Sequence, residues 1–191
     1  AGKTCIIRNI AATMALRGAK VRIVDLDLRE GTWGIALNMN RTGVSAYLNG
    51  KISDPVPAIQ NLRENLDVLT VGSLPPNPAE LLDSERFRGM MDVLAEHYDY
   101  VFMDCPPVDI VADSSIIAKS ADYTIFVMRA GLFDKRGLPL LNDLYASKVY
   151  SNMSLVLNGV DLTARKYGNY GRYGYGYGYG YGNIDSGSVN S

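Results

Sequence analysis

A short segment at the start of the chain has the residue types of a phosphate-binding loop. Gly2-Lys3-Thr4 precedes a stretch in which apolar residues follow helical spacing. Backbone amides at the start of a helix bind phosphate oxygens, a lysine reaches the outer phosphates, and a threonine hydroxyl coordinates Mg²⁺. The pattern therefore predicts nucleotide contacts at Gly2, Lys3 and Thr4. Because this tripeptide is common, a capped helix start with a solvated lysine is the alternative interpretation.

Two acidic segments have the residue types to complete such a site. The run Tyr100–Pro107 is an apolar strand that ends in Asp104, and its two prolines stop the strand. Asp104 is thus placed to bind Mg²⁺, although a carboxylate that caps the next segment has the same pattern. Asp25, Asp27 and Arg29 alternate after another apolar run, and they share one side if the backbone stays extended. Paired carboxylates can divide metal binding and proton acceptance between them; a solvated acidic turn is the alternative.

The C-terminal segment alternates tyrosine with glycine. Seven of the thirteen tyrosines fall within fifteen residues, at Tyr167, Tyr170, Tyr173, Tyr175, Tyr177, Tyr179 and Tyr181. Glycine at every second position gives a core nothing to pack and maximises chain entropy, so residues 163–191 are predicted to form a flexible tail. The tyrosine hydroxyls are candidate phosphate acceptors. Taken alone, the pattern equally fits a self-associating segment that is never phosphorylated.

The composition excludes several classes of function. Nineteen basic and twenty acidic residues give a formal net charge of -1, which removes the electrostatic case for nucleic acid as the main partner. Cys5 and Cys105 lie in apolar runs and are expected to be reduced, buried residues rather than a disulfide. His97 is the sole histidine, so a zinc site is not expected. Trp33, just past the aspartate pair, is interpreted as a core anchor, and packing beneath the loop of the site is the alternative. The sequence contains neither an apolar run long enough to span a membrane nor a signal peptide pattern.

Apolar runs and helical spacing alternate along the chain. Helices are predicted over residues 4–17, 79–96, 113–119 and 135–149, and buried strands over residues 21–24, 66–71, 100–103, 123–128 and 154–157. The alternation indicates an α/β fold with a mostly parallel sheet and helices on both faces. The strand ends at Asp25, Asp104 and Asn158 are then expected at one edge of the sheet, where open α/β sheets bind ligands.

The two ends of the chain predict its organisation. A phosphate loop is normally fed by a strand, whereas this sequence opens within the loop, so we expect a longer natural protein to precede Ala1. Residues 1–162 are expected to form one domain with a single core, because their number suits one domain and leaves no room for a second. Residues 163–191 are expected to be the tail.

These motifs together resemble the bacterial tyrosine autokinases of capsule and exopolysaccharide synthesis, which are P-loop ATPases. Two further segments, Gly43–Gly50 and Gly72–Ser84, also resemble segments of that family. The resemblance covers nearly the whole chain and includes the tyrosine cluster. It implies a P-loop NTPase-like fold with ATP and Mg²⁺ as cofactors.

The resemblance also implies roles for individual residues. Lys3 and Thr4 match the end of the Walker A motif, Asp25 and Asp27 match Walker A′, and Asp104 matches Walker B. The implied catalytic residues are Lys3, Asp25, Asp27 and Asp104, the nucleotide contacts Gly2, Lys3, Thr4 and Asn158, and the metal ligands Thr4, Asp25 and Asp104. Asp25 is expected to be the base or the carboxylate nearest the metal. Asn158 resembles the position at which related ATPases recognise adenine, and a plain turn at that position is the alternative.

A function and partners follow from the same resemblance. The expected reaction is ATP-dependent autophosphorylation of the seven tail tyrosines, in trans between subunits, which regulates synthesis and export of capsule or exopolysaccharide. Expected partners are further copies of the chain in a ring, a membrane-spanning activator or a fused transmembrane region, and a cognate tyrosine phosphatase. The expected location is the cytoplasm, at the inner face of the membrane. Two alternatives remain: a partitioning or cell-division ATPase with the same fold, and a regulatory subunit that binds nucleotide without turnover.

Overall fold

Three parallel strands form the centre of the main sheet in the computed structural model, which describes residues 2–31, 33–34, 42–107 and 111–161. The sheet order is β2-β3-β1-β4, with β2 (Gln60–Arg63) as an antiparallel edge beside β3 (Leu66–Leu69), β1 (Val21–Asp25) and β4 (Tyr100–Asp104). All five residues of β1 are buried, as expected for a central strand. The register pairs Asp25 with Asp104, so these two carboxylates end adjacent strands, as the sequence predicts.

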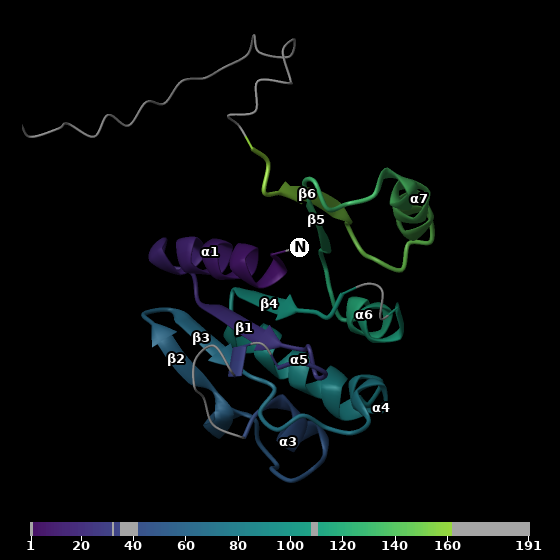
Figure 1. Cartoon of the computed structure of the whole chain (residues 1–191). Helices are drawn as coiled ribbons and strands as arrows, with labels where there is room; N and C mark the ends of the chain where they lie inside the picture. The colour runs from purple at the N-terminus through teal and green to yellow at the C-terminus, as the bar shows by residue number, and fades with distance from the viewer. Residues whose placement is uncertain (1, 32, 35–41, 108–110, 162–191) are drawn as a thin grey trace, which may run out of the picture. The chain divides into compact units, whose positions relative to one another are not determined.

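Helices cover both faces of this sheet. Helix α1 (Lys3–Leu16) belongs to a core cluster with Val21 and Ile23 of β1, whereas α5 (Glu85–His97) belongs to a second cluster with Val24. Because successive strand residues point to opposite faces, this alternation along β1 places the two helices on opposite sides, as Figure 1 shows. The predicted α/β architecture with helices on both faces is therefore confirmed.

The other helices are short. They are α3 (Val44–Leu48), α4 (Pro78–Leu82), α6 (Val111–Ala118) and α7 (Leu138–Ala146), with single 3₁₀ turns at Val56–Ala58 and Lys135–Gly137. The continuous helix predicted over residues 79–96 is wrong, because the chain breaks between α4 and α5. Ser84 caps the start of α5, where its side chain accepts a hydrogen bond from the backbone N–H of Phe87. A serine at this position favours a new helix start over a continuing helix.

A separate two-stranded parallel sheet consists of β5 (Ile125–Arg129) and β6 (Ser154–Asn158). All five predicted strands are thus present, but the single sheet expected from their alternation is not. The expected burial is also wrong for β5 and β6, whose side chains are half-buried or exposed. Within the described residues, β4 pairs with β1 and β5 pairs with β6, and these two pairs do not join. Apolar runs predict which segments become strands, whereas strand order depends on the pairing at each edge, which the runs do not encode.

Two elements, β2 and α3, are not predicted from the sequence patterns. The edge strand β2 reads Gln-Asn-Leu-Arg and alternates between half-buried and exposed side chains, so it has no apolar run. Helix α3 has five residues and follows Gly43, whose position tolerates no side chain: an added Cβ would lie 2.1 Å from the carbonyl oxygen of Thr70. The Val44 N–H then donates to that same oxygen over 2.9 Å. This glycine therefore lets α3 dock against the end of β3.

Residues 1–159 form one compact unit. Among the described residues, we find no helix with the length and apolarity needed to cross a membrane. The predicted boundary at residue 162 and the predicted tail over residues 163–191 lie outside the described residues, so both stay predictions.

Candidate functional site

The first turn of α1 meets the end of β4 through a side-chain hydrogen bond. The Thr4 hydroxyl donates to Oδ2 of Asp104 over 2.7 Å. Asp104 is only 3% exposed, and its backbone carbonyl accepts the N–H of Leu26 over 2.9 Å, which ties the end of β4 to the end of β1. A helix start, a hydroxyl and a buried carboxylate therefore converge at the carboxyl edge of the sheet, where the sequence predicts a phosphate site.

Asp25 is fully buried beside this pair. Its two carboxylate oxygens accept backbone N–H groups of Asp27 and Trp33, each over 3.2 Å. Burial raises the pKa of Asp25 to about 7, and the negative charges of Asp104 and Asp27 add to the rise, while the two backbone hydrogen bonds oppose it. A carboxylate with this pKa can exchange a proton near neutral pH, which is the property required of a general base.

Asp27 shapes the turn that follows β1. Its Oδ1 accepts the backbone N–H groups of Arg29 and Glu30 over 3.3 and 3.2 Å, and the side chain is 8% exposed. The backbone turns at residues 28–30, so the extended chain on which Asp25, Asp27 and Arg29 would share one side is not what forms. The hydrogen bonds that the Asp27 carboxylate accepts stabilise the turn more than an extended backbone would be stabilised at these residues. Aspartate commonly stabilises turns in this way.

Arg29 is held by a carboxylate that the sequence did not indicate. The guanidinium makes a bidentate pair with the buried Asp113 of α6, with Nε to Oδ2 at 2.7 Å and Nη2 to Oδ1 at 3.1 Å. The Asp113 side chain is 2% exposed and that of Arg29 is 40% exposed. This fork fixes the turn after β1 to α6, the helix that follows the Asp104 segment.

Trp33 contacts both carboxylates of the strand ends. Its backbone N–H donates to Asp25, and its indole Nε1–H donates to Oδ2 of Asp104 over 2.8 Å. The residue is 2% exposed, so the interpretation as a core anchor is correct but incomplete. The sequence contains one indication of these contacts, because the only tryptophan of the chain lies eight positions after Asp25.

The start of α1 also approaches the end of β6. Gly2 has φ of 88°, and an added Cβ would lie 2.5 Å from Nδ2 of Asn158, so a side chain is excluded there on both grounds. The predicted adenine contact therefore lies beside the predicted phosphate loop. Burial raises the pKa of the Cys105 thiol to about 12, and the charge of Lys3 opposes this rise. Cys5 is exposed, so the expectation that both cysteines are buried is wrong for Cys5.

The donor set suits Mg²⁺ bound together with a nucleotide. This ion needs one or two protein oxygen ligands when phosphates and water supply the rest, and the Thr4 hydroxyl and the Asp104 carboxylate already lie 2.7 Å apart. Over the part of the chain that the structure describes, no group of three or more His, Cys, Asp or Glu side chains is arranged to hold a metal ion. The assignment of Thr4, Asp25 and Asp104 as ligands stays a prediction.

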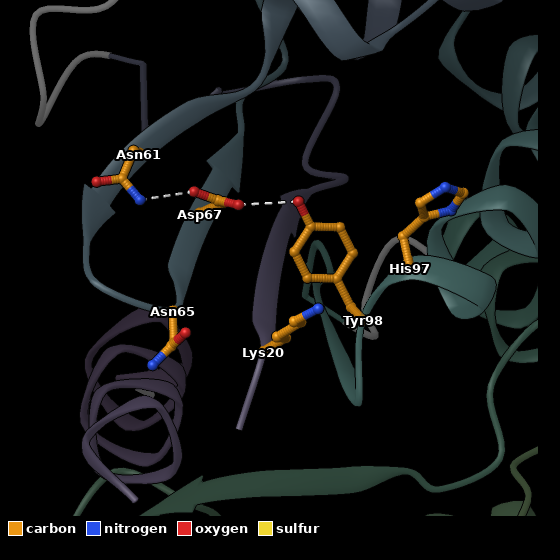
Figure 2. A pocket seen from close by; sticks show the side chains of 6 residues that line it. All are labelled: Lys20, Asn61, Asn65, Asp67, His97 and Tyr98. Carbon is orange, nitrogen blue, oxygen red and sulfur yellow. Dashed lines mark hydrogen bonds between the residues drawn. The ribbon is translucent and has the colours of Figure 1, made fainter. Parts of the chain in front are cut away.

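A polar pocket lies at the other, amino ends of the strands (Figure 2). Its lining residues are Lys20, Asn61, Asn65, Asp67, His97 and Tyr98. Asp67 accepts the Tyr98 hydroxyl over 2.8 Å and pairs over 3.4 Å with the buried Arg22, whose guanidinium lies 4.2 Å from the centre of the Tyr98 ring. These groups stabilise a buried cation within β1. The exposed His97 bonds through Nδ1 to the carbonyl of Val93, in agreement with its interpretation as a helix-end residue.

The predicted phosphate acceptors cannot be placed relative to this site. Tyr167, Tyr170, Tyr173, Tyr175, Tyr177, Tyr179 and Tyr181 all lie outside the described residues.

Comparison with known proteins gives consistent matches over this site. A family model described as an AAA domain matches residues 1–157. The chain is 33% identical over 174 residues to the tyrosine-protein kinase YwqD of Bacillus subtilis, covering 91% of this chain and 73% of that protein. It is 32% identical over 175 residues to the tyrosine-protein kinase CpsD of Streptococcus pneumoniae, covering 91% of this chain and 77% of that protein.

Solved structures give the same result. The kinase domain of the Escherichia coli tyrosine kinase ETK superposes with a TM-score of 0.78 at 34% identity, covering 92% of this chain and 68% of that chain. A cobyrinic acid a,c-diamide synthase from Mycobacterium smegmatis, solved with an ATP analogue and magnesium, matches with a TM-score of 0.63 at 20% identity, covering 81% of this chain and 66% of that chain. At that identity the second match concerns the fold alone.

Proposed function

The chain belongs to the bacterial tyrosine-protein kinases that carry an AAA domain, and from this premise we propose that its main substrate is its own C-terminal tyrosine cluster. Phosphoryl transfer at this site is supported by the convergence of Thr4, Asp104 and Asp25 near the start of α1, and the tail as substrate is supported by its seven clustered tyrosine hydroxyls. A helix start binds phosphate, a hydroxyl and a carboxylate bind Mg²⁺, and a second, buried carboxylate accepts a proton. Phosphoryl transfer requires these three functions together.

Each residue of the site has a separate role in the transfer of the γ-phosphoryl group. Lys3 and the backbone at the start of α1 hold the phosphates of ATP. Thr4 and Asp104 would hold Mg²⁺, whose positive charge would offset the negative charge of these phosphates. The phenolic oxygen of the acceptor bonds to the γ-phosphorus as the bond from that phosphorus to the β,γ-bridging oxygen breaks. ADP leaves with the electron pair of that bond, and the phenolic proton passes to Asp25. Asn158 contacts the adenine.

Asp25 is the better choice for the base, and Asp27 supports it. Asp25 is fully buried, and its pKa of about 7 allows it to hold and release a proton at neutral pH. Asp27 instead accepts two backbone N–H groups of the turn after β1, which fixes the loop that carries Asp25. Loss of Asp27 would therefore disturb the position of the base, whereas loss of Asp25 would remove it.

We propose that the tail is phosphorylated in trans by a neighbouring copy of the chain. A flexible segment of about twenty residues spans roughly 25 Å on average, so transfer in trans within a ring of subunits is feasible. Each phosphate adds about -1.5 to -2 charges, and modification of seven tyrosines would add on the order of -10 to -14 to a chain of formal charge -1. We propose that unmodified tails favour the ring and that heavily phosphorylated tails loosen it through repulsion.

The name of one relative supports a proposal for the biological setting. One relative, from Klebsiella pneumoniae, is named as a tyrosine-protein kinase in the cps region, at 35% identity over 172 residues, 88% of this chain and 24% of that protein. We propose that this chain likewise regulates synthesis and export of capsule or exopolysaccharide. It would act in the cytoplasm at the inner face of the membrane, with a membrane-spanning activator or fused transmembrane region, and with a cognate phosphatase that resets the tail.

A variant with phenylalanine at all seven tail tyrosines should acquire almost no phosphate on incubation with ATP and Mg²⁺. The reason is that the acceptor hydroxyls are removed while the residues of the site are untouched. Mass spectrometry of the intact protein, dephosphorylated beforehand, counts the phosphates added to each chain.

Exposed tyrosines outside the tail provide the control. Tyr123 and Tyr145 are 76% and 58% exposed, so a variant with phenylalanine at these two positions should acquire as many phosphates as the unchanged protein. If the tail variant also acquires the unchanged number, the acceptors lie elsewhere and the proposed substrate is wrong.

A further inference from the structure

Trp33 is the one described residue that donates hydrogen bonds to both strand-end carboxylates. Its indole N–H reaches Oδ2 of Asp104 over 2.8 Å, and its backbone N–H reaches Oδ2 of Asp25 over 3.2 Å. Any residue other than proline could supply the backbone bond. The bond to Asp104 requires a side chain with a donor at the far end of a wide apolar body, and among natural residues the indole of tryptophan fits this description best.

Both side-chain hydrogen bonds to Asp104 end on the same oxygen. The Thr4 hydroxyl and the Trp33 indole N–H each donate to Oδ2, over 2.7 and 2.8 Å, and neither donates to Oδ1. A carboxylate oxygen can accept two hydrogen bonds, and two donors from different directions fix the rotation of the carboxylate group. Among the described residues no side chain donates to Oδ1, so this is the oxygen that would face Mg²⁺.

The indole ring is itself immobilised by the core. Trp33 is 2% exposed and belongs to the cluster that contains Ala11 and Ala15 of α1 and Val21 and Ile23 of β1. Thr4 lies on the same helix as the first two of these residues. The donor on Trp33 and the donor on Thr4 are therefore held by one packed unit, which limits their movement relative to each other.

The chemistry of the donor matches this positioning role. An indole N–H donates only, and it neither ionises nor accepts a proton in the range of protein chemistry. It therefore cannot take part in the proton transfer assigned to Asp25, and it cannot bind a cation through its nitrogen. What it can do is hold the Asp104 carboxylate in place, as partners of metal-binding carboxylates do in other proteins.

We propose that Trp33 is a positioning residue that orients the Asp104 carboxylate for Mg²⁺. The inference rests on the proposed function in one respect, namely that Asp104 binds Mg²⁺ with a nucleotide. Loss of the indole N–H should then weaken binding of the metal and leave metal-independent contacts with the nucleotide unchanged.

The first test is the variant Trp33→Phe, which keeps an aromatic ring and removes the N–H. Binding of a fluorescent, non-hydrolysable ATP analogue is measured over a series of Mg²⁺ concentrations and in excess EDTA. Mg²⁺ should enhance binding of the analogue, and the Mg²⁺ concentration that gives half of the full enhancement should be about tenfold to a hundredfold higher for the variant. This is the usual effect of losing a group that orients a metal ligand. Affinity for the analogue in EDTA should stay the same.

A second replacement separates the N–H from the shape of the ring. Because the chain has one tryptophan, growth of a tryptophan auxotroph on β-(3-benzothienyl)alanine replaces Trp33 alone and substitutes sulfur for the N–H in a ring of nearly the same shape. This protein should show the same rise in the half-maximal Mg²⁺ concentration as Trp33→Phe. The packing of the core is preserved, so the test does not depend on how well the phenylalanine variant folds.

The outcomes distinguish the inference from the function on which it rests. If both replacements keep the Mg²⁺ dependence of the unchanged protein, the positioning role is wrong and the proposed function stands. Equal losses of affinity with Mg²⁺ and in EDTA would also overturn it, because they indicate a purely structural role. If the unchanged protein shows no Mg²⁺-dependent binding of the analogue, the proposed nucleotide site itself is wrong.

Discussion

Replacing Asp104 by asparagine is expected to slow tyrosine phosphorylation by roughly a hundred- to a thousandfold, the usual effect of removing one charge-stabilising group from an active site. Asp104 is buried and accepts hydrogen bonds from Thr4 and Trp33 on one oxygen. An asparagine keeps the shape but has no charge to attract Mg²⁺, and its amide nitrogen cannot accept a hydrogen bond. The single-turnover rate of phosphate transfer to the tail, at saturating ATP and several Mg²⁺ concentrations, measures the loss.

An exposed aspartate serves as the matched control for this change. Asp92 lies on α5 with its side chain exposed to solvent, and Asp92→Asn should transfer phosphate at the unchanged rate. An Asp104→Asn protein that folds and retains more than a tenth of the rate would contradict the assignment of Asp104 to the metal.

Replacing Asp25 by asparagine is expected to abolish transfer and to change how stability depends on pH. The pKa of Asp25 is about 7 in the folded protein and 3.8 in the reference state. The folded state therefore binds a proton that the unfolded state has released between these values, and stability falls as pH rises from about 4 to about 7. With about 1.4 kcal/mol for each pKa unit, the loss is on the order of 2–4 kcal/mol. An asparagine at this position carries no charge, so the stability of the variant should not fall in this way as the pH rises.

Urea unfolding in the absence of Mg²⁺ and nucleotide measures the effect. The free energy of unfolding of the variant minus that of the unchanged protein should be larger at pH 8 than at pH 5, by on the order of 2–4 kcal/mol. The comparison removes the contributions of other titrating groups, which both proteins share. Differences that are equal at the two pH values would show that Asp25 is not a buried carboxylate of raised pKa.

The strand ends are the part of the site that the sequence predicts well. Val21–Asp25 and Tyr100–Asp104 are apolar runs that each end in one aspartate. Both aspartates are buried, and each is tolerated there because residues beyond the strand end donate hydrogen bonds to it. The aspartate therefore marks the carboxyl edge of the sheet. The register of β1 and β4 then places Asp25 opposite Asp104.

The supporting contacts could not be predicted, because they join residues that have no common pattern. Trp33 reaches Asp104 across 71 positions of the chain, and Arg29 reaches Asp113 across 84. Each contact depends on how a turn or a helix is packed, which apolar periodicity does not report. The same holds for β2, whose polar sequence becomes a strand only because β3 offers it an edge.

The most direct test of the central claim uses Lys3→Met protein, produced in cells that contain no other tyrosine kinase. Lysine at this position would hold the outer phosphates, so its loss should stop transfer without altering the tail. Mass spectrometry of the C-terminal peptide that contains residues 167–181 is expected to show phosphate in the unchanged protein and none in the variant. Phosphorylated tyrosines in the variant would show that the site at the start of α1 does not modify the tail, and would contradict the account.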